Sequence, residues 1–300
     1  MRYGCTVDSS VPVPKVVEQV RRMADAGFDS VSMSQIFGYD ALTLLALVGS
    51  EVPDIELTTA VVPTYPRHPI MLAAQALTVQ AITGNRLTLG IGLSHQVVIE
   101  GMFGYSFDKP ARHMREYLTA LMPLLQGEQV AFEGETLKAA TMAPLEIDAP
   151  APPVLVAAMA PVMLRLAGEL ADGTVLWMTG PSTVSSHIVP AITKAASDAG
   201  RPAPRVAVGL PMCVTADADA AREKANTTFA IYGQLPSYRA MLDREGAAGP
   251  GDIALVGDEE SVRKAIAGIE DAGATEFAAA PYGTREEQER AFALLADIAR

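Results

Sequence analysis

The sequence predicts an α/β protein built as a closed (β/α)8 barrel, or TIM barrel, with insertions after the fourth and seventh strands. Short apolar, β-branched segments alternate with helical segments along the whole chain. Eight such strands fit within the 300 residues, a usual size for this barrel. The first strand runs into Thr6-Val7-Asp8-Ser9 without a glycine loop, which argues against an open dinucleotide-binding sheet.

Strands are expected where short apolar runs end at glycine or proline. The clearest run is Leu57 to Val62, which Pro63 and Pro66 stop, and the next is Leu87 to Gly92. Because these runs are apolar throughout, both faces of each strand should be buried, as in a parallel sheet. The expected strands are residues 2–7, 30–34, 57–62, 87–92, 154–158, 173–178, 205–214 and 276–280.

Helices are expected between these strands, with ordinary start and stop signals at their ends. Asp40 suits an N-cap and Pro69 suits the first turn of a helix. Gly27, Gly84 and Gly200 close three of the helices. The expected helices are residues 14–26, 40–49, 69–83, 111–126, 162–171, 182–199, 218–232, 259–272 and 285–298.

Two stretches are longer than ordinary barrel loops. After the fourth strand, residues 96–110 form an excursion, residues 129–137 read as a small hairpin and residues 143–153 are a proline-rich connector. After the seventh strand, residues 233–251 predict a short helix and a mobile loop. We find no long repeat and no low-complexity linker, so residues 1–300 are expected to form one domain.

Composition excludes several classes of protein. The net charge of −12 argues against binding to nucleic acid or to an anionic membrane surface. No apolar run is long enough to span a bilayer, and the N-terminus lacks the apolar core of a signal peptide. Cys5 and Cys213 lie in apolar strands and read as buried hydrophobic residues. We therefore expect a cytoplasmic protein with neither a disulfide framework nor a zinc site.

Polar residues just beyond the strands mark the expected site, because barrel enzymes place their chemistry at the carboxyl ends of the strands. His95 follows the fourth strand directly, after Gly92 and Ser94. We interpret it as a hydrogen-bond partner of a ring cofactor or substrate, the alternative being a polar loop residue. His68 either caps the third helix or lines the barrel mouth. The four histidines lack metal-binding spacing, so no metal site is expected.

A phosphate site is a second expectation. Residues 157–161 (AAMAP) end the fifth strand and open a helix, where small residues and free backbone amides favour an anion. Thr179 and Gly180, after the sixth strand, could supply a hydroxyl and an amide to the same phosphate. A tight turn without any ligand is the alternative.

Five segments in the same order and spacing resemble the luciferase-like monooxygenase superfamily, in its branch of F420-dependent oxidoreductases of the actinobacterial type. They are GFDSVSMSQ, LTTAVVPTYPRHPIMLAAQALTVQ, NRLTLGIGLSH, PVLVAAMAPVMLRLAGELADGTVLWMTGP and ALVGDEESVRKAIAGIEDAGATEF. The resemblance implies a TIM barrel that holds coenzyme F420, a deazaflavin, at the carboxyl ends of its strands.

The resemblance also implies particular cofactor-binding residues. A non-proline cis peptide that packs against the deazaflavin ring would lie at Ala60–Val61, near Gly92. The cofactor phosphate would be held by backbone at the ends of the fifth and sixth strands. These positions correspond to Met159, Ala160, Thr179 and Gly180.

The chain departs from the family pattern at three positions. Where several relatives carry an Asp-His pair after the second strand, this chain has Gln35 and Ile36. The acidic residue expected after the fourth strand is His95, and Pro181 stands where a sugar-phosphate dehydrogenase would carry a lysine. Oxidation of a sugar phosphate is therefore disfavoured.

We thus predict an F420-dependent oxidoreductase that moves a hydride between the deazaflavin and an uncharged, fairly apolar organic substrate. Gln35 and His95 would position polar atoms of the ring or protonate the substrate. One alternative is an FMN-dependent luciferase-like monooxygenase on the same barrel. Another is a non-catalytic protein that binds a deazaflavin or a metabolite. The expected partners are a small-molecule substrate and a second copy in a homodimer.

Overall fold

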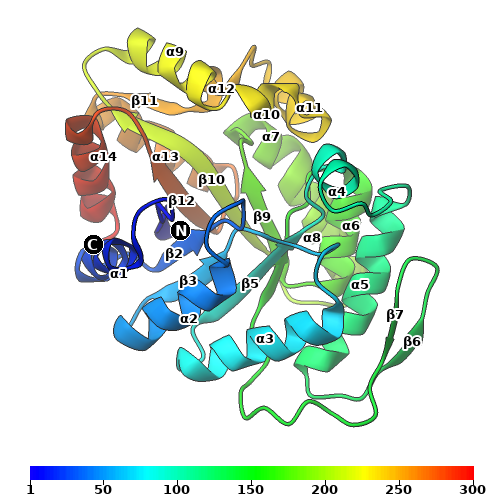
Figure 1. Cartoon of the computed structure of the whole chain (residues 1–300). Coiled ribbons are helices and arrows are strands. Elements are labelled where there is room, and N and C mark those ends of the chain that lie inside the picture. The colour runs from blue at the N-terminus through cyan, green and yellow to red at the C-terminus, as the bar shows by residue number, and fades with distance from the viewer.

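The computed structural model describes residues 1–300 and shows eight parallel strands closed into a barrel, with helices around it (Figure 1). Each barrel strand pairs with its neighbour, β12 returns to β1, and β9 pairs with β10 to complete the ring. This confirms the predicted fold. The barrel strands are β1 (Arg2–Thr6), β2 (Ser30–Met33), β3 (Glu56–Thr59), β5 (Leu87–Gly92), β8 (Val154–Val156), β9 (Gly173–Trp177), β10 (Arg205–Val214) and β12 (Glu276–Pro281).

The helices pack around the outside of the strands and begin at the expected signals. The Asp40 carboxylate accepts a hydrogen bond from the Thr43 amide at 2.8 Å, as expected of an N-cap. A buried cluster of 69 residues fills the space between strands and helices. The surrounding helices are α1 (Val13–Asp25), α2 (Ala41–Glu51), α3 (Pro69–Ile82), α5 (Pro110–Leu125), α6 (Pro161–Leu170), α7 (Pro181–Thr183), the π-helix η1 (Val184–Ile188), α8 (Val189–Asp198), α9 (Ala218–Thr228), α13 (Glu259–Asp271) and α14 (Arg285–Ile298).

Both predicted insertions are present, and each contains more structure than the sequence indicated. After β5 come α4 (Gln96–Gly101) and the hairpin of β6 (Ala131–Glu133) and β7 (Lys138–Ala140). After β10 come α10 (Ala230–Gln234), α11 (Pro236–Glu245), α12 (Pro250–Ile253) and the short strand β11 (Leu255–Gly257), which pairs with β10. Residues 233–251, expected to form a short helix and a mobile loop, are therefore largely helical. None of the helices combines the length and the apolar character that a membrane span requires.

The amino ends of the strands are joined by a partly buried network of charges. The Arg205 guanidinium donates to the carboxylates of Glu276 at 2.7 Å and Glu56 at 2.6 Å, and Arg2 donates to Glu56 at 2.9 Å. Burial alone would raise the pKa of Glu56, but the charges of Arg205 and Arg2 outweigh it and lower the pKa. This network closes the floor of the barrel and leaves the opposite end open for a site.

Candidate active site

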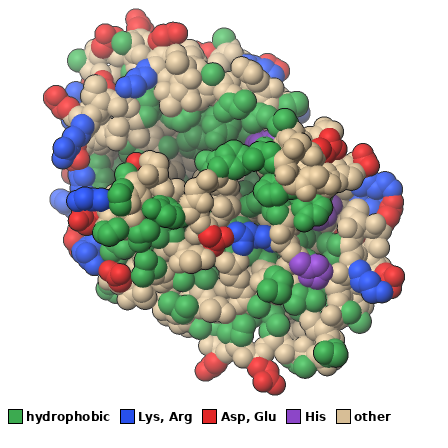
Figure 2. All heavy atoms as spheres, viewed as in Figure 1, with side chains coloured by type: hydrophobic (Ala, Val, Ile, Leu, Met, Phe, Trp, Pro, Cys, Tyr) green, Lys and Arg blue, Asp and Glu red, His purple; other side chains and the backbone are tan.

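A pocket of about 970 Å³ opens at the carboxyl ends of the barrel strands and extends into the barrel. Of its 37 lining residues, 21 are hydrophobic, so the pocket suits a largely apolar ligand. Figure 2 shows hydrophobic side chains gathered around the hollow on this face of the molecule. Gln35, Ala60, Val61, His95 and Met159 all line the pocket, so five of the predicted site residues are brought together.

The third barrel strand is interrupted where the pocket begins. The peptide bond between Ala60 and Val61 is cis, at the position that the family resemblance indicates, and it separates β3 from β4 (Val62–Pro63). Ser34 Oγ donates to the Ala60 carbonyl at 2.7 Å, and the Gln35 amide donates to the Val61 carbonyl at 3.3 Å. The end of β2 thereby holds this bulge, while the Val61 amide has no partner within the chain.

Gly92 does not line the pocket but lets the bulge approach β5. A Cβ atom at residue 92 would lie 2.7 Å from Val61 Cγ2 and 3.2 Å from the Ala157 Cβ. The first distance is shorter than carbon atoms tolerate, so a side chain here would push the bulge into the pocket. Gly92 therefore acts on the site through Val61.

The Gln35 side chain lines the pocket, and the oxygen of its side-chain amide already accepts a hydrogen bond within the chain. Its Oε1 accepts a hydrogen bond from the Ala41 amide at 2.7 Å, at the start of α2. The Nε2 group is then the part that can donate to a ligand. Gln35 is thus a fixed hydrogen-bond donor rather than a group that takes up protons.

His95 stands where β5 gives way to α4, after Ser94 in a left-handed conformation with φ of 62°. Its ring lies 5.8 Å from the ring of Tyr238, centroid to centroid, and it makes no hydrogen bond to another residue. Burial lowers the pKa of His95 below its usual value, because the charged form loses hydration. The imidazole is therefore neutral at neutral pH and can donate from one nitrogen or accept at the other.

An aromatic wall, formed by Trp177, Tyr232 and Tyr238, faces the pocket. The sequence analysis did not identify Tyr232 and Tyr238 as site residues. The rings of Trp177 and Tyr232 are 5.9 Å apart, and those of Tyr232 and Tyr238 are 5.0 Å apart, both edge to face. Burial raises the pKa of both tyrosines, so their hydroxyls stay protonated. The indole nitrogen of Trp177 is buried and directed toward the Tyr232 hydroxyl, without a regular hydrogen bond. A wall of this kind supplies flat apolar surface and hydrogen-bond donors.

The predicted phosphate residues fall into two groups. Met159 lines the pocket, and Ala160 is the N-cap of α6, whose first turn has no side-chain cap. Thr179 is fully buried and its hydroxyl donates to the Trp177 carbonyl at 3.3 Å. Gly180 lies beneath Glu245: a Cβ atom added at Gly180 would be 2.4 Å from the carboxylate carbon of Glu245. Neither Thr179 nor Gly180 lines the pocket.

Glu245 occupies the start of the helix that follows Gly180. Its carboxylate accepts hydrogen bonds from the amides of Ser182 at 3.0 Å and Thr183 at 2.7 Å. A carboxylate is favoured at a helix N-terminus for the same reason as a phosphate, because the unpaired amides point toward it. The anion position at α7 is therefore filled by the chain itself.

The charged groups of the pocket are mostly paired. The Arg67 guanidinium is bonded to the Asp40 carboxylate and donates to Gln75 Oε1 at 2.8 Å. Glu276 is neutralised by Arg205 on the barrel floor. A charged substrate would find few free partners of opposite sign, and the structure contains no cluster of potential metal ligands.

The other histidines lie outside the pocket lining. His68 caps α3, since its Nδ1 accepts from the Ile70 amide at 3.3 Å. His113 is buried, with Nε2 3.1 Å from Thr64 Oγ1 and its ring stacked on Tyr65. His187 Nε2 lies 2.8 Å from the Met159 carbonyl, which helps to hold the end of the fifth barrel strand.

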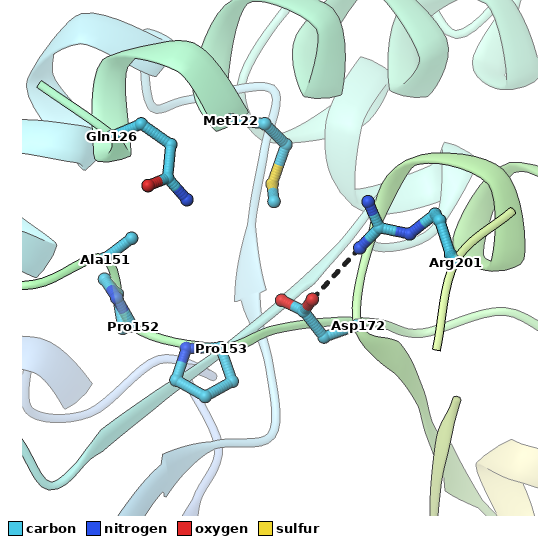
Figure 3. A pocket seen from close by; sticks show the side chains of 7 residues that line it. All are labelled: Met122, Gln126, Ala151, Pro152, Pro153, Asp172 and Arg201. Carbon is cyan, nitrogen blue, oxygen red and sulfur yellow. Dashed lines mark hydrogen bonds and ion pairs between the residues drawn. The ribbon is translucent and has the colours of Figure 1, made fainter. Parts of the chain in front are cut away.

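A second hollow, of about 350 Å³, lies at the other end of the barrel (Figure 3). It is bordered by Pro153, just before β8, and by Asp172, just before β9. Asp172 accepts from Arg201 at 3.0 Å and from the Val154 amide at 2.8 Å, so its charge is used to join these segments. We assign this hollow a structural role.

A profile of the luciferase-like monooxygenases matches residues 2–276. This chain belongs to the luciferase-like monooxygenase family. A 5,10-methylenetetrahydromethanopterin reductase of Methanolobus tindarius is 29% identical over 251 residues, which cover 82% of this chain and 75% of that protein. Membership identifies the chain as an enzyme of the luciferase-like family, as the five sequence segments indicated.

Solved structures of the luciferase-like fold superimpose on nearly the whole chain. The coenzyme F420-dependent tetrahydromethanopterin reductase of Methanopyrus kandleri matches with a TM-score of 0.82 at 23% identity, covering 98% of this chain and 97% of the other. The oxygenating constituent of 3,6-diketocamphane monooxygenase from Pseudomonas putida, in complex with FMN, matches with a TM-score of 0.75 at 18% identity, covering 100% and 97%. The barrel is therefore common to F420 and FMN proteins.

Proposed function

We propose that this luciferase-like protein is an F420-dependent oxidoreductase that acts on an uncharged, fairly apolar organic substrate. The observation that carries the proposal is the pocket itself: the Ala60–Val61 bulge, the aromatic wall and an apolar lining surround one space at the carboxyl end of the barrel. Relatives named as F420-dependent or methanopterin reductases support the choice of cofactor.

The residues fit a flat heterocycle with polar edges. The Val61 amide is a hydrogen-bond donor without a partner in the chain, and Val61 lines the pocket. Unpaired donors in an apolar pocket match ring carbonyls, since buried polar groups are normally hydrogen-bonded. Bound F420 would supply the hydride acceptor or donor at C5 of its deazaflavin ring.

The phosphate of the cofactor would be held at the start of α6. Met159 and Ala160 lead into that helix, and its first-turn amides lack a side-chain cap. Thr179 Oγ1 lies 3.8 Å from Met159 Sδ, and Gly180 lies against Glu245, so both would shape this position from behind. The site thus combines an apolar ring pocket with one free helix N-terminus.

His95 and Gln35 would act on the reacting groups. Gln35 Nε2 donates from a fixed position, because α2 holds its carbonyl oxygen. His95 is neutral at neutral pH and would orient the substrate or accept a proton from it. Both residues are proposed as catalytic.

The proposal is tested by turnover with the reduced cofactor. Purified protein is mixed with reduced F420 and a panel of neutral ketones, enones and quinones, and oxidation of the cofactor is followed by its absorbance. Consumption of cofactor that needs both protein and substrate supports an oxidoreductase. Binding without any turnover, in either direction of transfer, would instead favour a deazaflavin-binding protein without catalysis.

A further inference from the structure

The inside of the barrel below the bulge is hollow, whereas TIM barrels are usually filled there by bulky branched side chains. The pocket continues between the strands to Glu276 on the barrel floor. On the side of β10 and β12, the lining includes the small residues Ala207, Gly209, Ala278 and Ala280, which leave room, together with Val208 and Phe277. These small residues turn the barrel core into a well.

The opposite side of the well carries a row of hydroxyls. Thr6, Ser32 and Thr58 stand side by side on β1, β2 and β3, as the strand register shows. Ser30 lies one layer lower on β2, beside Glu56. All four hydroxyl residues line the pocket, so the well has one polar wall and one apolar wall.

The hydroxyls of this wall are left without partners. Thr58 is 6% exposed, and its Oγ1 is buried without any hydrogen bond, while the Ser32 hydroxyl makes none either. Threonines that point away from the well are satisfied: Thr59 Oγ1 donates to the Gly90 carbonyl at 2.8 Å, and Thr174 Oγ1 donates to the Val156 carbonyl at 2.8 Å. Buried hydroxyls are normally bonded. The Ser32 hydroxyl lacks a partner and is not fully enclosed, so a ligand in the well meets it first, with the enclosed Thr58 hydroxyl on the neighbouring strand directly beside it.

The charges at the floor select against ions. The Glu276 carboxylate would repel an anion, and it is already paired with Arg205, so a cation would find no free acceptor. A hydroxyl can both donate and accept. The well therefore suits a neutral group such as an alcohol or a carbonyl.

We propose that the well formed by Thr6, Ser30, Ser32 and Thr58 is a second subsite, which binds a neutral hydroxyl- or carbonyl-bearing part of the substrate. The proposal rests on the proposed function only in naming the occupant as substrate. The substrate is then an amphipathic neutral molecule whose polar group enters the barrel, and whose apolar surface lies against β10 and β12.

Trp177 is the single tryptophan of the chain and lines the pocket, so its fluorescence reports binding without any cofactor. We would titrate cyclohexanol and methylcyclohexane, which share a ring but differ in the hydroxyl. Thr58→Val keeps the side-chain shape and removes its hydroxyl, and Ser32→Ala does the same at the neighbouring position. Thr119→Val, on the exposed face of α5, is the matched control.

Thr58→Val should weaken cyclohexanol binding about fivefold and leave methylcyclohexane binding within about twofold. Ser32→Ala should show the same selective loss, and Thr119→Val should show none. The melting temperature of Thr58→Val should not fall, since the lost hydroxyl had no partner. Equal effects on both probes, or no effect on either, would overturn the subsite.

F420 binding to the same variants separates this proposal from the cofactor assignment. Thr58→Val should bind F420 as the wild type does, within about twofold. A selective loss of F420 affinity would show that the well binds the cofactor, and would overturn the assignment of the well to the substrate. If the wild type fails to bind F420 at all, the proposed function falls while the cyclohexanol result stands.

Discussion

The ionisation state of His95 decides what this residue can do. Burial lowers its pKa, so little imidazolium is present at pH 7 and donation of a full proton is disfavoured. We expect His95→Ala to reduce turnover by about 10²-fold with little loss of stability. His95→Gln keeps a hydrogen bond but cannot titrate. Steady-state kinetics with reduced F420 would compare them, and wild-type turnover in both variants would remove His95 from the reaction.

The pH dependence of activity should follow from the same shift. The proposed role of His95 needs a neutral imidazole, and the lowered pKa keeps the ring mostly neutral down to about pH 6.5, the ordinary pKa of histidine. The kcat/KM of the wild type should therefore be flat from about pH 8 to 6.5 and fall at lower pH. An activity that rises on acidification through this range would mean that the imidazolium is the active form.

His113 should make stability depend on pH. Burial lowers its pKa to about 4, whereas in the unfolded chain it titrates near 6.5. Between these values the unfolded chain binds a proton that the folded chain does not, so stability falls as pH drops from about 6.5 to 4 and is constant above. Urea unfolding at pH 7.5 and pH 5 would measure this difference in the free energy of unfolding. The difference should be smaller in His113→Gln and unchanged in the control His68→Gln, at an exposed position.

Pocket-lining residues that follow a strand directly could be predicted, and residues that join the pocket from elsewhere could not. Gln35, His95 and Met159 stand at strand ends, where position alone indicates function. Tyr232 and Tyr238 come from helices in an insertion, and sequence spacing does not say which face such helices present. The unpaired hydroxyl of Thr58 sits within an apolar strand, and its lack of a partner is visible only in three dimensions.

The bulge depends on the close approach of two strands. An alanine at residue 92 would place its Cβ 2.7 Å from Val61 Cγ2, so the bulge must shift toward the pocket. We expect Gly92→Ala to weaken F420 binding at least about tenfold, with a loss of stability of about 1–3 kcal/mol. Fluorescence titration and urea unfolding would measure both. A folded variant with unchanged affinity would show that the cofactor does not touch the bulge.

Glu245 joins the α11 helix to the start of α7. Removing an acceptor from a helix N-terminus costs about 1 kcal/mol, so Glu245→Ala should lower the melting temperature while Glu245→Gln lowers it less. With the phosphate at α6, neither variant changes F420 affinity beyond about twofold. Tighter binding by Glu245→Ala would instead show that its carboxylate competes with the phosphate, and would place the phosphate at Thr179 and Gly180.

Elements of regular length could be predicted, and short ones could not. The strand at Leu87–Gly92 and the helix at Arg285–Ile298 have the expected bounds, because their apolar patterns are long and their ends are marked. The six residues of α4 and the three of β11 are too short to show a period. β11 exists because β10 offers a free edge beyond the barrel, which is a tertiary property.

At the scale of the whole molecule, the interior of the barrel is charged at one end and hollow and largely apolar at the other. Its floor is a charged network centred on Arg205, and above it lies a hollow that widens into an apolar pocket. The closed sheet was predictable from eight alternating units, since that number completes a barrel. The hollow was not, because small inward residues such as Ala207 and Ala278 look like ordinary strand residues in the sequence.

The central claim is the choice of cofactor, and equilibrium binding of F420 and FMN to the same preparation tests it most directly. Each is titrated against the purified protein, with quenching of fluorescence as the readout. We predict that F420 binds at least about tenfold tighter than FMN, a difference of about 1.4 kcal/mol. Equal affinity, or a preference for FMN, would contradict the account and point to an FMN-dependent monooxygenase.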